Sequence, residues 1–147
     1  MPDTYTYDGQ CHCGAIQVRL DLSQPATDVG LRACQCGFCR PRGVTTVADP
    51  DGAATLTTAR EANLIRYRFG YGIADYLLCA TCGTYVGATQ DDDGRRIATL
   101  NIAGLDVAAF AGRHGDPVRY DNETDEERSA RRATAWMPLG LTFTATH

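Results

Sequence analysis

Seven cysteines in three short clusters are the residues of this chain whose types and spacing best suit chemistry. The clusters read C-H-C at residues 11–13, C-Q-C-G-F-C at 34–39 and C-A-T-C-G at 79–83. Two thiolates three residues apart can bind one zinc ion at about 2.3 Å each, while N–H groups of the turn donate hydrogen bonds to the sulfur atoms. Buried cysteines that act only as small apolar side chains would not repeat this spacing, so the clusters predict zinc binding.

The number of thiolates indicates two zinc sites of different kinds. A structural zinc takes four protein ligands, whereas a catalytic zinc takes three and leaves a position for water or substrate. The pairs in the first and third clusters can each supply half of a structural site. Its expected ligands are Cys11, Cys13, Cys79 and Cys82. The compact second cluster supplies three ligands, as a catalytic site requires: Cys34, Cys36 and Cys39.

The fourth ligand of this triplet is not evident in the sequence. His114 or His12 could complete a closed Cys3His site, and the second zinc would then be structural as well. However, His12 lies inside the C-x-C pair, and His114 lies in a Gly-Arg-His-Gly segment typical of a surface turn, so both are expected to face solvent. Sequence alone permits either arrangement.

Two arginines, Arg40 and Arg42, follow the triplet. Their cations could hold an anionic substrate beside the metal, although basic residues in a loop are more often ordinary surface residues. Arg40 is the better candidate, because it directly follows Cys39.

The elements that must position these clusters are predicted to be short strands. Residues 15–22 alternate between apolar and polar side chains, which indicates a half-buried strand, and residues 64–70 repeat the pattern. Further strands are expected at 4–7, 44–48, 54–57, 76–79, 84–89 and 96–102. Turn signals separate them, namely D-P-D-G at 49–52, G-Y-G at 70–72 and D-D-D-G at 91–94. The pattern predicts a mostly β, antiparallel domain.

Short helices are expected only in the last third of the chain. Asp106 could cap a helix that is ended by Gly112. Thr124 and Glu127 form a capping box for a second helix, whose apolar face is mostly alanine, so that helix should lie on the surface. Trp136 should anchor the segment that follows it.

Composition limits the class of protein. With 147 residues, 44% hydrophobic and 22% charged, the chain fits one globular domain, residues 1–147. A net charge of −4 without a basic stripe argues against nucleic acid as a partner. No export signal or membrane span is evident, so we expect a cytoplasmic protein with reduced thiols and no membrane partner. A thiol redox function is disfavoured, because no C-x-x-C opens an expected helix.

The motifs resemble those of the glutathione-dependent formaldehyde-activating family, also called the centromere protein V family. The resemblance covers roughly residues 8–105, with G-x-C-x-C-G-A-I before a strand, C-x-C-x-x-C-R, and C-x-x-C-G-T after a tyrosine and aliphatic residues. It implies a β-rich zinc scaffold. The structural ligands would be Cys11, Cys13, Cys79 and Cys82, and the catalytic ligands Cys34, Cys36 and Cys39.

The resemblance also implies a reaction. A carbon–sulfur lyase of this kind adds a thiol such as glutathione to a small aldehyde such as formaldehyde and yields S-(hydroxymethyl)glutathione. The expected partners are then a small-molecule thiol and aldehyde, and the expected cofactors are two zinc ions, one structural and one catalytic. A non-catalytic, zinc-stabilised binding module is the alternative, since one fold can serve several functions. A second zinc site closed by protein ligands would favour that alternative.

Overall fold

The computed structural model describes residues 3–145, which form eleven strands, one α-helix and four short 3₁₀ helices. The strands are β1 (Tyr5–Gln10), β2 (Ile16–Leu22), β3 (Arg32–Cys34), β4 (Thr46–Val47), β5 (Ala53–Thr58), β6 (Leu64–Tyr67), β7 (Asp75–Cys79), β8 (Tyr85–Asp92), β9 (Arg95–Asn101), β10 (Asp116–Val118) and β11 (Met137–Phe143). The helices are η1 (Ala26–Asp28), η2 (Arg40–Arg42), η3 (Glu61–Asn63), η4 (Ala108–Phe110) and α1 (Asp125–Ala135).

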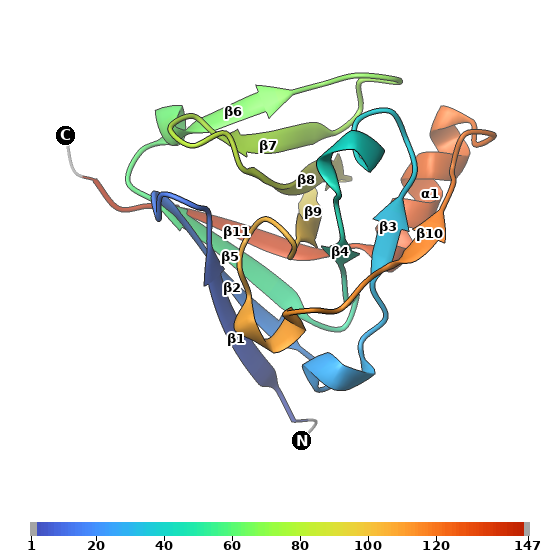
Figure 1. The fold of residues 1–147 in the computed structure, drawn as a ribbon. Coiled ribbons are helices and arrows are strands. Elements are labelled where there is room, and N and C mark those ends of the chain that lie inside the picture. Colours follow the sequence, from blue (N-terminus) through green and yellow to red (C-terminus); the bar gives the residue numbers. More distant parts are fainter. Residues whose placement is uncertain (1–2, 146–147) are drawn as a thin grey trace.

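Strand β11 joins two parts of the sheet, because its first residues pair with β9 and its later residues pair with β5. One part has the order β1-β2-β5-β11. In the other part, β8, β7 and β6 follow β9 in one direction, while β4, β3 and β10 follow it in the other (Figure 1). Helix α1 lies near β3 and β10 in Figure 1. The sheet therefore brings segments from the start, middle and end of the chain to one region.

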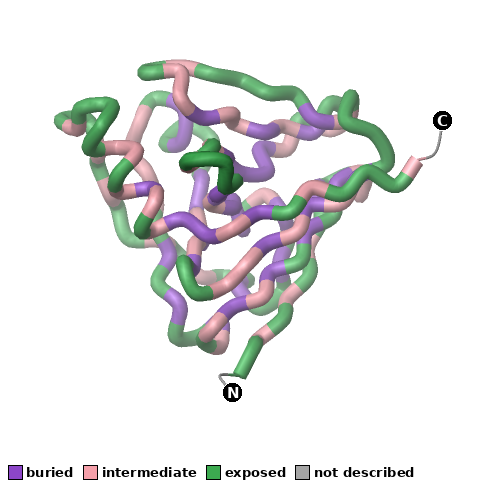
Figure 2. Tube along the Cα trace, turned by 180° about the vertical axis from the view of Figure 1, so that it is seen from behind, coloured by how far each residue is buried: buried purple, intermediate pink, exposed green. Residues whose placement is uncertain are grey.

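The buried core follows the alternation of residues 15–22 but not that of 64–70, where Ile65 and Tyr67 are 49% and 48% exposed on β6. Every second side chain of β2, from Ile16 to Leu22, is buried, which confirms the strand expected at 15–22. Figure 2 shows buried segments in the interior and exposed ones in the surrounding loops. The turn expected at D-D-D-G is confirmed for its last two residues: Asp93 and Gly94 connect β8 to β9 with φ angles of 52° and 85°, as a two-residue hairpin turn requires. Asp91 and Asp92 instead end β8 and pair with β9.

Two strand pairs are parallel, whereas the sequence predicts an antiparallel sheet. β11 runs parallel to β5, and β10 runs parallel to β3, with Asp116 opposite Arg32. The late strands contain Pro138 and Pro117, which weaken a strand signal because proline donates no backbone hydrogen bond. The fold class is nevertheless confirmed, because the domain is mostly β and its other strand pairs are antiparallel.

The two expected helices have different outcomes. The capping box is confirmed: the Glu127 N–H donates to Thr124 Oγ1 at 3.1 Å, and the Thr124 N–H donates to Glu127 Oε1 at 3.0 Å. The helix expected from Asp106 is wrong in extent, because only the single 3₁₀ turn η4 forms there. Asp106 has a φ of 50°, whereas a capping residue normally has an extended backbone.

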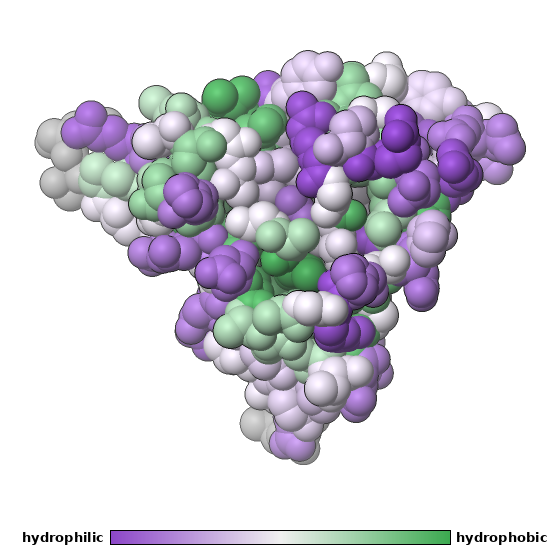
Figure 3. Space-filling model, in the orientation of Figure 1, coloured by the Kyte–Doolittle hydropathy of each residue, from purple (hydrophilic) through white to green (hydrophobic). Residues whose placement is uncertain are grey.

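Trp136 directly follows α1 and is buried in a cluster with Ala88 and Ile97, as expected for an anchor. On the face shown in Figure 3, hydrophilic side chains gather around α1 and β10, while hydrophobic ones gather over β6, where Ile65 is 49% exposed. Within residues 3–145, no helix combines the length and the apolar character needed to cross a membrane.

Candidate metal centres and an adjoining cavity

The four cysteines expected at a structural site lie together. Cys11 and Cys13 lie in the connection between β1 and β2, Cys79 ends β7, and Cys82 lies in the turn before β8. Their sulfur atoms are all within 4.8 Å of one another. Cys13 Sγ is 3.7 Å from Cys11 Sγ and 3.6 Å from Cys79 Sγ. The cluster therefore ties the first hairpin to the middle of the chain.

These sulfur–sulfur distances fit a tetrahedral zinc site. Four sulfur atoms at about 2.3 Å from one ion lie about 3.8 Å from each other. The N–H group of Ile16 donates to Cys11 Sγ at 3.3 Å, and that of Cys82 donates to Cys79 Sγ at 3.5 Å. Such hydrogen bonds stabilise the thiolate form that a metal requires. The cluster could therefore hold a zinc ion.

Glycines shape both turns of this cluster. Gly14 and Gly83 have φ angles of 82° and 80°, a region that glycine enters at little cost. The Gly14 N–H donates to the Cys11 carbonyl at 3.0 Å, and the Gly83 N–H donates to the Cys79 carbonyl at 2.9 Å. The residues of a C-x-C-G or C-x-x-C-G segment are thus sufficient to form its turn. For this reason the sequence predicts this part of the site.

The second cysteine cluster lies at the end of β3 and in the loop that follows. The sulfur atoms of Cys34, Cys36 and Cys39 are within 4.8 Å of one another, and the Cys39 N–H donates to Cys36 Sγ at 3.3 Å. This triplet could also hold a metal ion.

No histidine completes the triplet among the described residues. His12 and His114 are exposed, and neither belongs to the group of potential ligands around the triplet. The third histidine, His147, lies outside the described residues. Within residues 3–145, the closed Cys3His alternative therefore has no ligand to support it.

The three thiols of the triplet perturb one another. Hydrogen bonds from Cys34, the main cause, and from Cys39 hold the pKa of Cys36 far below its ordinary value. The same contacts raise the pKa of Cys39, with Cys34 the main cause. A dication bound by the three sulfur atoms would favour the thiolate form of all of them.

A cavity of about 340 Å³ adjoins the triplet, and Cys34 and Cys39 are part of its lining. Its walls include the aromatic residues Tyr76, Tyr85, Tyr120 and Trp136. The four-cysteine cluster does not line this cavity. Of the two cysteine clusters, only the triplet therefore contributes to the wall of this cavity.

Burial affects two tyrosines, Tyr76 and Tyr85, that pack in the same hydrophobic cluster as the triplet. It raises the pKa of Tyr76 and raises that of Tyr85 still further, because desolvation disfavours the phenolate. Both rings pack against Phe38, at centroid distances of 5.0 and 4.9 Å. Phe38 itself lies inside the C-x-C-x-x-C motif. The motif thus supplies both the sulfur atoms of the triplet and Phe38, the aromatic residue that packs in the same cluster.

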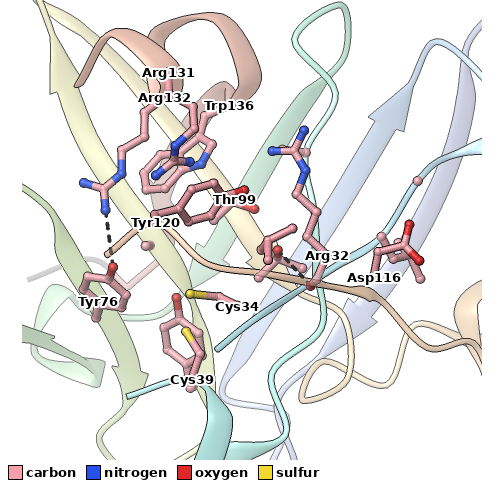
Figure 4. Close-up of a pocket in the computed structure, with 17 residues that line it drawn as sticks. Arg32, Cys34, Cys39, Tyr76, Thr99, Asp116, Tyr120, Arg131, Arg132 and Trp136 are labelled. Atoms are coloured by element: carbon pink, nitrogen blue, oxygen red, sulfur yellow. Dashed lines mark hydrogen bonds between the residues drawn. The ribbon is translucent and has the colours of Figure 1, made fainter. Parts of the chain in front are cut away.

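Three arginines and one aspartate line the cavity, in a chain whose net charge is −4. Arg32 comes from β3, while Arg131 and Arg132 come from α1. In Figure 4, Arg32 and Arg132 lie on opposite sides of the space above Cys34 and Cys39. The cavity is therefore more cationic than the protein as a whole, which suits an anionic ligand.

Arg40 lies beside the triplet but outside this lining. Its side chain is exposed at the start of η2, and it is not among the residues of the cavity wall. Arg42 packs its guanidinium 4.0 Å from the centroid of the Phe38 ring and donates to the Phe38 carbonyl at 2.9 Å.

Sequence reasoning missed Arg132 and Tyr76 as residues of the site. Arg132 belongs to the helix that the sequence predicts to lie on the surface, yet it is 5% exposed. The one available signal was the pair Arg131 and Arg132, which lies one helical turn before Trp136, the only tryptophan of the sequence.

The comparison with family models supports the resemblance noted in the sequence. A family model described as glutathione-dependent formaldehyde-activating enzyme matches residues 6–117. A solved structure of a Rhodobacter sphaeroides protein is 33% identical, with 67% of this chain and 86% of that chain covered and a TM-score of 0.48. The comparison with curated proteins gave no match. Helix α1 lies beyond the residues that the family model matches.

Proposed function

The chain belongs to the glutathione-dependent formaldehyde-activating family, and from this premise we propose that it is a zinc-dependent carbon–sulfur lyase. Its substrates would be a thiol such as glutathione and a small aldehyde such as formaldehyde. The observation that carries this proposal is the cavity, because Cys34 and Cys39 line it. Sulfur ligands at the wall of a cavity of this size suit chemistry on a small molecule.

We assign different roles to the two cysteine clusters. The four-cysteine cluster supplies a complete tetrahedral ligand set and would hold a structural zinc. The triplet supplies three sulfur ligands beside the cavity and would hold a catalytic zinc. When bound there, zinc supplies the means to deprotonate an incoming thiol, whose pKa in water is about 8.5.

The reaction forms a bond between the thiol sulfur and the aldehyde carbon. The π electrons of the carbonyl move to its oxygen, which takes up the proton that the thiol has lost. The phenols of Tyr76 and Tyr85 line the cavity. Both stay protonated at neutral pH, because an ordinary phenol has a pKa of about 10 and burial raises the pKa of these two further. Either phenol can donate a hydrogen bond to the oxygen as its negative charge develops.

This proposal is tested by the rate at which glutathione and formaldehyde form their adduct. We expect the zinc-loaded protein to accelerate adduct formation above the spontaneous rate, and protein treated with a chelator to lose that acceleration. A panel of other thiols and aldehydes extends the test to related substrates. Glutathione binding without acceleration for any pair would instead favour the non-catalytic binding module.

Arg40 is proposed to steady the carboxylates of an anionic thiol from the edge of the site. Because its side chain is exposed, solvent screens the contact, so Arg40→Ala should raise the KM for glutathione only about two- to fivefold with little change in kcat. Cysteamine, a thiol without carboxylates, is the matched control and should show no change in KM. An equal effect on both thiols would remove Arg40 from substrate binding.

A further inference from the structure

Arg132 is a buried cation without a charged partner. It is 5% exposed, and it forms no ion pair with any carboxylate in the described part of the chain. The neighbouring arginines of α1 differ, because Arg131 binds Glu123 through two hydrogen bonds of 2.7 and 3.0 Å, and Arg128 binds the same carboxylate at 3.3 Å. Of these three arginines, only the buried Arg132 has no carboxylate to balance its positive charge.

The contacts of Arg132 are all with neutral groups. One terminal nitrogen donates to Gln90 Oε1 at 2.9 Å, and the other donates to the Tyr76 hydroxyl at 3.4 Å. The guanidinium carbon lies 4.6 Å from the centroid of the Trp136 ring. The buried Nε has no hydrogen-bond partner within residues 3–145. These contacts fix the orientation of the guanidinium, but they leave its charge unmatched, its Nε–H without an acceptor and one N–H of each terminal nitrogen unused.

Burial without a counter-charge is unfavourable for a guanidinium. Desolvation accordingly lowers the pKa of Arg132, although arginine remains a cation in proteins. A hydrophobic side chain of similar size would fill the same volume without this cost. An anion that enters the cavity would supply the missing charge and accept hydrogen bonds from the N–H groups of the terminal nitrogens that Gln90 and Tyr76 leave unused.

An anion bound to Arg132 would lie in the same cavity as the triplet. Arg132 lines the same cavity as Cys34 and Cys39, and Figure 4 shows these sulfur atoms on one side of the cavity and Arg132 with Tyr76 on another. A small molecule with a carboxylate at one end and a reacting group at the other can therefore contact both. The planar guanidinium suits a carboxylate in particular, since it can donate two parallel hydrogen bonds.

We propose that Arg132 binds a carboxylate of the substrate and thereby selects anionic over neutral molecules at this site. The inference rests on the proposed function in one respect, namely that the bound molecule reacts at the triplet. Arg132 lies beyond the residues 6–117 that the family model matches. The selectivity is thus a property of the C-terminal segment of this chain. The carboxylate belongs either to the thiol or to the aldehyde.

Binding measured without turnover tests this inference. Isothermal titration calorimetry on the zinc-loaded protein compares S-methylglutathione with its diethyl ester, and glyoxylate with ethyl glyoxylate. If the thiol carries the carboxylate, Arg132→Gln should weaken S-methylglutathione binding by about 10- to 100-fold, because hydrogen bonds to charged groups are strong. If the aldehyde carries it, the same loss appears for glyoxylate. The esters should bind the native protein and the variant equally.

Two further variants separate recognition from folding and from net charge. Arg132→Lys keeps the charge but not the two parallel donors, so it should restore only part of the binding. Arg128→Gln removes an arginine of the same helix that bonds Glu123 and does not line the cavity, and it should leave binding unchanged. Melting curves and zinc content of each variant establish that the fold is intact.

Several results would overturn the proposal. These are failure of both acids to bind the native protein, unchanged affinity in Arg132→Gln, or equal losses for acids and esters. The proposed lyase activity can fail separately: Arg132-dependent binding without adduct formation would contradict the activity alone. Adduct formation with Arg132-independent binding would contradict this inference alone.

Discussion

Replacing Cys79 by serine should abolish folding of the protein at ordinary temperature. Cys79 is fully buried and ends β7, and its sulfur lies among those of Cys11, Cys13 and Cys82. A structural zinc can contribute on the order of 10 kcal/mol to folding, which is comparable to the whole stability of a domain of this size. Loss of one of four thiolates should therefore yield insoluble or unfolded protein.

Thr81→Ser is the matched control, because Thr81 lies exposed in the same C-x-x-C turn. Circular dichroism and melting curves, together with zinc analysis, should show a native fold for this control. A soluble Cys79→Ser protein with an unchanged Tm and unchanged zinc content would contradict the assignment of a structural site to these four cysteines.

Replacing Cys36 by serine should remove one zinc per chain and the catalytic acceleration, while the fold survives. Cys36 is only half-buried, and its triplet lies in one local stretch of chain. The large core cluster, which includes Cys11 and Cys79, contains no member of the triplet. We therefore expect the Tm to fall by no more than about 5 °C, equivalent to roughly 1–2 kcal/mol for this length.

A chelator titration of the native protein provides the second measurement for this prediction. The zinc of the triplet should leave first, because it has one protein sulfur fewer than the other site. Adduct formation should disappear in that first step, while the near-native circular dichroism spectrum persists. Unfolding of Cys36→Ser, or departure of both zinc ions in a single step, would contradict the division of the seven cysteines into four and three.

The sequence by itself determined the parts of the site whose geometry is local. In the C-x-C-G and C-x-x-C-G segments, residues two or three positions apart fix the separation of the sulfur atoms, and the glycines allow the positive φ that closes each turn. Alternation likewise identified β2, because its side chains point to opposite faces of the sheet in turn. The capping box identified the start of α1 for the same reason, since all its contacts lie within four residues.

Only the tertiary structure decided what surrounds the triplet. The parallel pairing of β10 with β3 joins segments that are more than eighty residues apart and gives no local pattern. The cavity is lined by residues of both strands, of β8 and of α1, so it exists only once these long-range contacts have formed. Arg132 illustrates the difference: its sequence neighbours suggest an exposed helix, but whether a charge is buried and unpaired depends on which distant side chains enclose it.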